Sequence, residues 1–518
     1  MGTFGRPAIW FCIRQRGRAE KSGWIDYPAL PELPARIGAN GDSTVEVCVT
    51  ERSRPVSPDQ TSRVFCNRAR GVIGLEIAYR DETVRLAPTR MLAANLRFGR
   101  ALERFRKERD LSAAEFEDHR RLSTFAARQF LLAGDGWAGA TELYRGSPLV
   151  APEPSDDEDR VADLAKGIGR WMLNNLSPEG GLPYKYWPSR GEVAPSDNAI
   201  RRFLATLSLA RLAKLQGNAE MAEAARRNLS FNLRRDFQNL GDGRGAIVER
   251  TGAKLGAAAL AALCILESPA RREFATELKL LTAGVNSLAD EELGFRTFFF
   301  PAERDGQNWN FYSGEALLFW AEAARRGIEG APTLERCVAT FERCGERHRR
   351  ARNPAFVPWH AQAGASLFAQ TGRREVADFV FEISDWLLPM QQWEGLDPDL
   401  RGRFYDPRHP EFGPPHAAST GAYLEGLADA LGLARSLGDE HRAAAYERVI
   451  QRGLRSLRQL QFRGPHDTFY ISKRKRVLGA LRTEAYDNAV RVDSAAHALG
   501  AAEKLLGQRQ VQPVGGRT

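Results

Sequence analysis

The sequence predicts a mainly α-helical protein, an (α/α)6 toroid of six inner and six outer helices that is preceded by a smaller α+β domain. Three observations lead to this prediction. From residue 159 onward, two kinds of helical segment alternate strictly, and each kind occurs six times. The turns after one kind are short, whereas most of the loops before it are long. Upstream of this region, apolar residues instead recur at every second position, which is the period of a β-strand.

The α+β domain is expected to span residues 1–146. Apolar and polar residues alternate in 7–15, 43–51 and 72–88, and Arg80 and Asp81 stand between two β-rich runs, which predicts a hairpin. The segment after residue 90 changes to a helical period.

Residues 1–150 contain 24 Lys and Arg against 18 Asp and Glu, with the basic residues concentrated between Arg97 and Arg109. A basic region of this kind can favour anionic partners. The alternative, which the interleaved Glu103, Glu108 and Asp110 favour, is a solvated helix face.

A linker is expected at residues 147–158, where three prolines precede a run of acidic residues. These carboxylates directly precede a helical pattern, and negative charge is favourable at a helix N-terminus. A metal-binding acidic motif is the alternative interpretation. The toroid is then expected at 159–508, with a flexible tail at 509–518.

The inner helices are predicted from their high content of alanine and glycine. They are apolar around most of their circumference, which is typical of a helix packed on all sides. They are expected at residues 198–215, 252–266, 312–324, 359–370, 419–434 and 492–506. The charged, amphipathic outer helices are expected between them. Because the inner helices begin at unequal intervals, a solenoid with a fixed repeat of about 34 residues is excluded.

The helical region resembles a known superfamily in five segments: YKYWP with DNAIRR (184–202), LGAAALAAL (255–263), YSGEALLFW (312–320), STGAYLEGLADAL (419–431) and RVDSAAHAL (491–499). It is similar to the six-hairpin glycosidase-like toroids, and most of all to the catalytic toroid of D-glucuronyl C5-epimerase-like proteins. The resemblance covers essentially the whole second domain. Members of the superfamily include glycoside hydrolases, polysaccharide lyases and sugar epimerases, so the resemblance implies a carbohydrate-active enzyme.

A toroid has a funnel at its long-loop end, which is the expected ligand site. Acid–base chemistry there needs carboxylates, histidine or tyrosine, and sugar binding uses aromatic faces. The catalytic candidates are Glu315, Glu425, Asp493, His497 and Tyr486. The substrate-binding candidates are Tyr184, Tyr186, Trp187, Asn198, Arg201, Trp309, Asn310, Tyr312, Trp359, His360, His416, Arg482 and Arg491.

Helical spacing supports several of these candidates. Asp493 and His497 share one face of the last inner helix, and Tyr312 and Glu315 share a face of the third. Each pair could equally be an anchor between neighbouring helices. Arg201 on a buried helix needs an anionic partner, and both an internal carboxylate and an acidic ligand would serve.

The candidates leave the reaction open. Glycoside hydrolysis needs two carboxylates across the cleft, such as Glu315 with Glu425 or Asp493. Epimerisation or elimination at a uronate needs a tyrosine or histidine base and a cationic clamp for the carboxylate. The alternative functions are modification of a peptide or another non-sugar substrate, and a non-catalytic scaffold with the N-terminal domain as a docking module.

Composition limits the remaining classes. The sequence contains no apolar run long enough to span a membrane, and its N-terminus lacks the features of a signal peptide. Six cysteines without framework spacing indicate a reducing cytoplasm. No cofactor or metal is predicted, because no metal-ligand spacing occurs. The basic run at 473–476 lacks interleaved aromatic residues, which disfavours nucleic acid. The expected partner is a saccharide or another small or oligomeric substrate, and the oligomeric state stays open.

Overall fold

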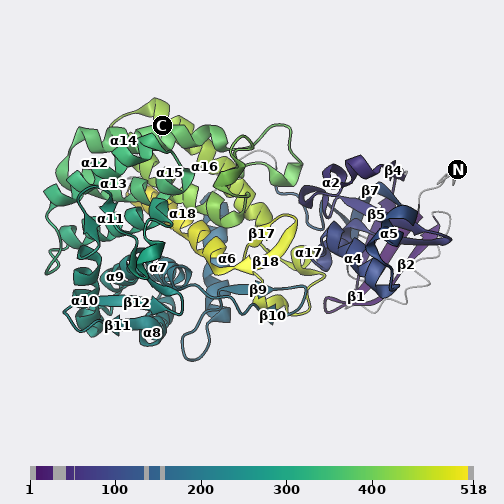
Figure 1. Cartoon of the computed structure of the whole chain (residues 1–518), viewed down its shortest axis with the longest axis horizontal. Coiled ribbons are helices and arrows are strands. Elements are labelled where there is room, and N and C mark those ends of the chain that lie inside the picture. The colour runs from purple at the N-terminus through teal and green to yellow at the C-terminus, as the bar shows by residue number, and fades with distance from the viewer. Residues whose placement is uncertain (1–7, 27–42, 52, 134–138, 152–157, 512–518) are drawn as a thin grey trace.

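The computed structural model describes residues 8–26, 43–51, 53–133, 139–151 and 158–511. The N-terminal sheet lies at one end of the molecule and a large helical body at the other (Figure 1). Strands β17 (Arg482–Glu484) and β18 (Asp487–Arg491) and the short helix α17 (Pro465–Thr468) lie between them.

The described strands of the N-terminal part form an eight-stranded antiparallel sheet, in which β2, β1, β3, β7, β5 and β6 follow one another and β4 and β8 also pair with β7. The strands are β1 (Ala8–Gln15), β2 (Arg18–Asp26), β3 (Ser43–Thr50), β4 (Arg54–Val56), β5 (Ile73–Tyr79), β6 (Glu82–Leu86), β7 (Arg120–Ala133) and β8 (Ala140–Leu143). The predicted hairpin is confirmed, since β5 pairs with β6 across Arg80 and Asp81. Apolar side chains of α3 (Pro88–Ala93), α4 (Phe98–Glu108) and α5 (Ala113–His119) pack together with those of β5 and β7.

The toroid is confirmed. Within residues 158–511 the inner helices are α7 (Ala199–Gln216), α9 (Leu255–Glu267), α11 (Trp309–Arg325), α13 (Val357–Thr371), α15 (Ala417–Ser436) and α18 (Val492–Val511). The outer helices are α6 (Glu158–Asn175), α8 (Ala219–Asp236), α10 (Ala275–Asn286), α12 (Leu334–Arg350), α14 (Arg374–Leu387) and α16 (Glu440–Leu460). Each inner helix packs against the next, and α18 packs against α7, so the six inner helices form a closed ring.

Local sequence explains the two kinds of helix. In α9 every residue from Leu255 to Leu266 is buried, as expected for a helix surrounded by others. In α12 the buried side chains include Cys337, Phe341 and Cys344, which recur three to four residues apart and face the ring, while charged residues face water. The Asn198 side chain accepts a hydrogen bond from the Arg201 backbone N–H and caps α7.

The end of the last helix differs from the prediction. Helix α18 continues to Val511, three residues beyond the expected boundary at 508. The side-chain amide of Gln508 donates to the Ala428 carbonyl at 2.7 Å and ties this last turn to α15. Residues 512–518 of the expected tail and residues 152–157 of the expected linker lie outside the described residues.

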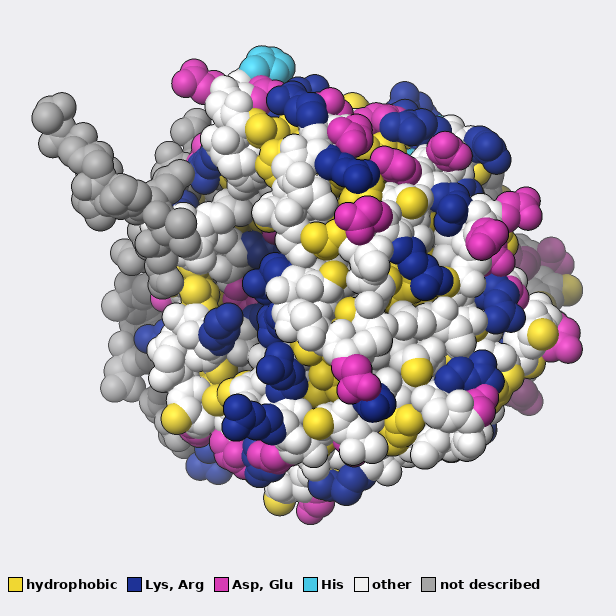
Figure 2. All heavy atoms as spheres, turned by 90° about the vertical axis from the view of Figure 1, so that its left-hand side faces the viewer, with side chains coloured by type: hydrophobic (Ala, Val, Ile, Leu, Met, Phe, Trp, Pro, Cys, Tyr) yellow, Lys and Arg dark blue, Asp and Glu magenta, His cyan; other side chains and the backbone are white. Residues whose placement is uncertain are grey.

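Short antiparallel sheets form in the loops at the long-loop end of the toroid. One joins β9 (Lys185–Trp187) and β10 (Glu192–Val193) to β17 (Arg482–Glu484) and β18 (Asp487–Arg491). On the toroid face that points away from the N-terminal domain, acidic and basic side chains are interspersed over the surface (Figure 2). Among the described residues, every helix is too short or too polar to cross a bilayer.

Candidate active site

A cavity of about 390 Å³ lies at the long-loop end of the toroid. All six inner helices contribute to it, either from their first two turns or from the residues just before them. The predicted candidates that line it are Asn198, Arg201, Tyr312, Glu315, Trp359, His416, Arg491, Asp493 and His497.

Asp493 is held in the cavity wall by contacts from Arg201, Arg491 and its own helix. Its Oδ1 accepts from Arg491 Nε at 3.0 Å and from the Ser494 backbone N–H at 3.1 Å, and its Oδ2 pairs with Arg201 Nε at 2.9 Å and with Arg491 Nη2. Burial opposes ionisation of this carboxyl, but the two arginines outweigh burial and lower its pKa to about 2. Asp493 is therefore ionised, and its oxygens are already occupied.

Tyr184 supports both arginines from outside the cavity. Its hydroxyl accepts a hydrogen bond from Arg201 Nη1, and its ring lies 5.0 Å from the Arg201 guanidinium and 5.9 Å from that of Arg491. Arg201 Nη2 and Arg491 Nη1 form no hydrogen bond with the described residues. These two groups are available to a ligand.

His497 is held by a carboxylate on the neighbouring inner helix. Its Nδ1 lies 2.7 Å from Glu425 Oε2. A carboxylate can only accept, so Nδ1 carries the proton and Nε2 is left for a ligand. Glu425 does not line the cavity and fills the space over Gly500, where any Cβ would collide with its carboxyl group. The predicted pairing of His497 with Asp493 is thus replaced by a pairing with Glu425.

Glu315 reaches the cavity from α11 in a very different environment. Its side chain is buried, and Oε2 has no hydrogen-bond partner among the described residues. Burial raises the pKa of this carboxyl to about 8. It packs on Gly256 of α9, where a Cβ would collide with Oε2. Glu315 is therefore a protonated acid at neutral pH.

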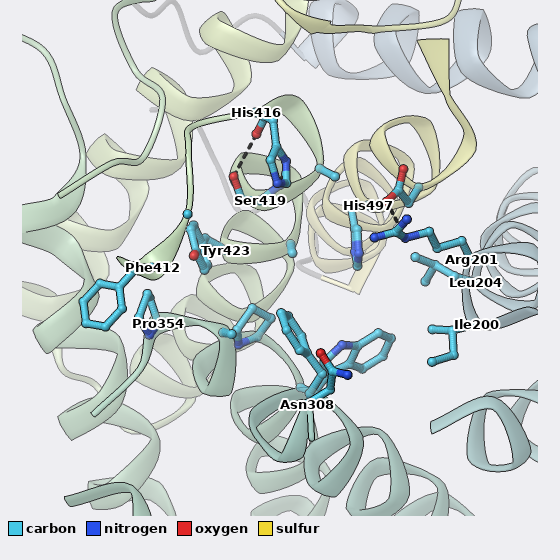
Figure 3. Close-up of a pocket in the computed structure, with 18 of the residues that line it drawn as sticks. Ile200, Arg201, Leu204, Asn308, Pro354, Phe412, His416, Ser419, Tyr423 and His497 are labelled. Carbon is cyan, nitrogen blue, oxygen red and sulfur yellow. Dashed lines mark hydrogen bonds and ion pairs between the residues drawn. The ribbon is translucent and has the colours of Figure 1, made fainter. Parts of the chain in front are cut away.

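Helix α15 presents one face to the cavity through His416, Ser419 and Tyr423 (Figure 3). His416 Nδ1 accepts from the Ser419 backbone N–H at 3.0 Å and caps the helix. Burial, together with the nearby Arg491 and Arg201, lowers the pKa of His416 to about 4, so the ring is neutral. Its Nε2–H remains as a donor.

Further charged groups line the cavity. Lys254 pairs with Glu249 at 2.5 Å, whereas Arg304 donates to the Thr251 carbonyl at 2.9 Å and lies over the Phe298 ring. Asp406 is paired with Arg408, and that hydrogen-bonded pairing lowers its pKa. The cavity is lined by four cationic side chains, Arg201, Lys254, Arg304 and Arg491, against two ionised carboxylates, Asp406 and Asp493. The charged side chains that line the cavity therefore carry a net positive charge.

Several predicted residues lie away from the cavity because they serve the core. The His360 ring stacks on Phe356 with a centroid separation of 3.4 Å and bonds the Phe356 carbonyl and Ser313. Trp309 also stacks on Phe356 and donates to the Leu293 carbonyl. Both rings belong to the packing between α11 and α13.

The remaining predicted residues are also outside the cavity. Tyr186 is buried in the toroid core, and Trp187 lies against Arg190. Asn310 lies in the first turn of α11 but is not among the residues that line the cavity. Two predicted residues instead lie toward the N-terminal domain. Arg482 donates to the Asp467 carbonyl at 3.2 Å, and the Tyr486 ring lies 6.0 Å from the Arg70 guanidinium.

Some residues that line the cavity were not predicted from the sequence. They are chiefly Lys254, Arg304, Asn308, Phe311, Phe412, Ser419 and Tyr423. The spacing of His416, Ser419 and Tyr423, at i, i+3 and i+7, is the one signal that could have identified a shared helix face. In the part of the chain that the structure describes, no group of three or more His, Cys, Asp or Glu side chains could hold a metal ion.

Comparison with known proteins identifies the fold. No protein-family model and no curated protein sequence matches the chain. Among solved structures, a D-mannose isomerase is similar with a TM-score of 0.50 and 13% identity, covering 68% of this chain and 100% of its own. An unsaturated glucuronyl hydrolase specific for heparin is similar with a TM-score of 0.48 and 11% identity, covering 68% and 99%. The first similarity agrees with the toroid fold that the inner and outer helices form.

Proposed function

We propose that this chain is a carbohydrate-active enzyme that binds an acidic saccharide in the toroid cavity and moves a proton at one of its carbons. The observation that carries the proposal is that one cavity is lined both by a histidine with one ring nitrogen open to a ligand and by a buried, protonated carboxyl group. His497 offers Nε2 because Glu425 holds Nδ1, and Glu315 is protonated because it is buried without a charged partner.

The order of helices in the ring supports this assignment. Helices α11 and α18 are three positions apart in either direction, so they are opposite members of the ring. Glu315 and His497 therefore approach a bound sugar from opposite sides. His497 Nε2 would take the proton from a carbon next to a carbonyl or carboxyl group, and Glu315 would donate its proton to the oxygen on which negative charge develops. Epimerisation, isomerisation and elimination all begin in this way.

Hydrolysis is less well supported by the same geometry. A glycoside hydrolase needs a second carboxylate that is free to act as nucleophile or base. Asp493 has both oxygens engaged by two arginines, Asp406 is engaged by Arg408, and Glu425 lies behind His497. Glu315 is thus the one cavity carboxyl without an ionic partner among the described residues.

The positive surplus of the lining supports an acidic substrate. The two arginines that hold Asp493 each keep one nitrogen, Arg201 Nη2 and Arg491 Nη1, without a hydrogen bond to the described residues, and a guanidinium binds a carboxylate well. The preferred ligand is therefore a sugar with a carboxylate group, such as a uronic acid.

The test is exchange of carbon-bound hydrogen with solvent. The purified protein is incubated in D2O with D-glucuronate, D-galacturonate, D-mannose and cellobiose, and deuterium incorporation is followed by NMR. We expect incorporation into a uronate that His497→Gln and Glu315→Gln each reduce at least about 100-fold. Exchange that survives both substitutions, or binding of every sugar in the panel without any exchange, would contradict the proposal.

A further inference from the structure

The N-terminal domain reaches the toroid next to the strand that carries the cavity arginine. Helix α3 contacts β18, the five-residue strand that ends at Arg491. In Figure 1, β18 lies between the toroid helices and the N-terminal sheet. One end of β18 thus belongs to the domain boundary and the other end to the cavity.

Two hydrogen bonds join the N-terminal domain to the end of β18 that lies away from the cavity. Asn95 Nδ2 donates to Asp487 Oδ1 at 2.9 Å, and Asn488 Nδ2 donates to the Leu92 carbonyl at 2.7 Å. Asn488 is fully buried and also accepts from the Tyr470 hydroxyl at 3.2 Å. The same Asp487 oxygen accepts from the Ala489 backbone N–H at 3.0 Å, so the contact with Asn95 reaches the strand backbone directly.

The near end of β18 is built into the cavity wall. Arg491 is paired with Lys185 of β9, and the Val492 backbone N–H donates to the Tyr184 carbonyl at 2.9 Å. Tyr184 is the residue whose ring supports Arg201 and Arg491. An extended strand rises about 3.3 Å per residue, so the domain contact at Asn488 is only about 10 Å from Arg491.

We propose that the N-terminal domain aligns the ligand site: its contacts with Asp487 and Asn488 set the position of β18, and through it the position of Arg491 and Asp493. Asn95 is then a positioning residue that acts on the cavity without touching it. A buried ion pair also holds the domain boundary together. Arg145 donates to Asp399 across it at 2.6 Å, with both side chains almost completely buried.

The test uses the full chain and exchanges the hydrogen-bonding side chains of Asn95 and Asp487. Asn95 has a left-handed backbone with φ of 49°, so Asn95→Gly removes the side chain without adding strain. Asn95→Asp places two carboxylates face to face, and Asn95→Asp with Asp487→Asn restores one donor and one acceptor. Arg68→Ala is the matched control, because it removes a contact with Asp397 at the same boundary but away from β18.

The first readout does not depend on the proposed function. Hydrogen–deuterium exchange of the Val490 and Val492 amides is expected to become at least about fivefold faster in Asn95→Gly and Asn95→Asp. We expect the double swap to return to within about twofold of the unaltered chain, and Arg68→Ala to leave these amides unchanged. Unchanged exchange in both single variants would overturn the inference.

The second readout is the affinity for D-glucuronate, which rests on the proposed function. At a temperature at which every variant is folded, Asn95→Gly is expected to bind about tenfold more weakly and the double swap to recover. If the unaltered chain binds no uronate, the proposed function fails while amide exchange still decides the positioning role. Faster exchange with unchanged affinity would refute alignment of the ligand site.

Discussion

Glu315→Gln is expected to stabilise the protein at neutral pH while it removes activity. The folded protein holds the Glu315 carboxyl protonated, with a pKa of about 8 against an ordinary value of 4.5. Below pH 4.5 the group is protonated in both the folded and the unfolded chain and has no effect. As the pH rises toward 8, unfolding releases a proton, so the free energy of unfolding falls. Relative to low pH, this effect lowers the free energy of unfolding by about 1 kcal/mol at pH 5 and by about 3 kcal/mol at pH 7.

The glutamine side chain has nearly the same shape and does not titrate. The difference in free energy of unfolding between Glu315→Gln and the unaltered chain is therefore expected to grow by about 2 to 3 kcal/mol from pH 5 to pH 7. Urea unfolding at both pH values measures it. Glu329→Gln, at a side chain that is 79% exposed, controls for the loss of one negative charge. A difference that is the same at both pH values would show that Glu315 is ionised in the folded protein, and the assignment of the acid would be wrong.

Three further perturbations follow from the structure. Gly500→Ala is expected to displace Glu425 and to slow the incorporation of solvent deuterium into the sugar at least about tenfold. An unchanged rate of incorporation would show that Glu425 does not hold His497 in place. Burial lowers the pKa of His348 to about 4, so the unfolded chain binds more protons below pH 6.5 and stability is lost on acidification. His348→Phe should remove about 2 kcal/mol of the loss measured by urea unfolding between pH 7 and pH 5, and an unchanged loss would contradict the assignment. Arg145→Met leaves a buried carboxylate unpaired and is expected to cost about 3 to 5 kcal/mol in urea unfolding, whereas a cost below about 1 kcal/mol would contradict the buried pair.

The toroid was predictable because its helices differ in kind. Inner helices such as α9 consist almost wholly of small and apolar residues, and outer helices such as α12 have one charged face. Strand β7 was not predicted, because its own sequence has no regular pattern that marks a strand. The exposed Arg121 and Arg128 interrupt its apolar positions, and its pairing with both β3 and β5 depends on residues far away in the sequence.

The same uniformity limits the prediction of the site. A helix that is buried all round has no polar face to fix its rotation, so the sequence of α15 does not show whether Tyr423 or Glu425 faces the cavity. On α18, Asp493 and His497 do face the cavity, as their spacing suggested, but the partner of the histidine comes from α15. Such a pairing between helices depends on Gly500, which gives no chemical signal in the sequence.

The closed ring has a consequence for the order in which the protein can be made. Helix α18 completes the ring, and the Ser208 hydroxyl of α7 donates to the Ala496 carbonyl of α18 across 288 residues of chain. At a synthesis rate of 5 to 20 residues per second, roughly 15 to 60 s pass between the synthesis of Ser208 and that of Ala496. During this time the side of α7 that α18 later covers is exposed to water, and the corresponding side of α15 joins it once residues 417–436 have been made. The nascent chain is therefore most in need of protection from aggregation just before the segment that carries Asp493 and His497 emerges.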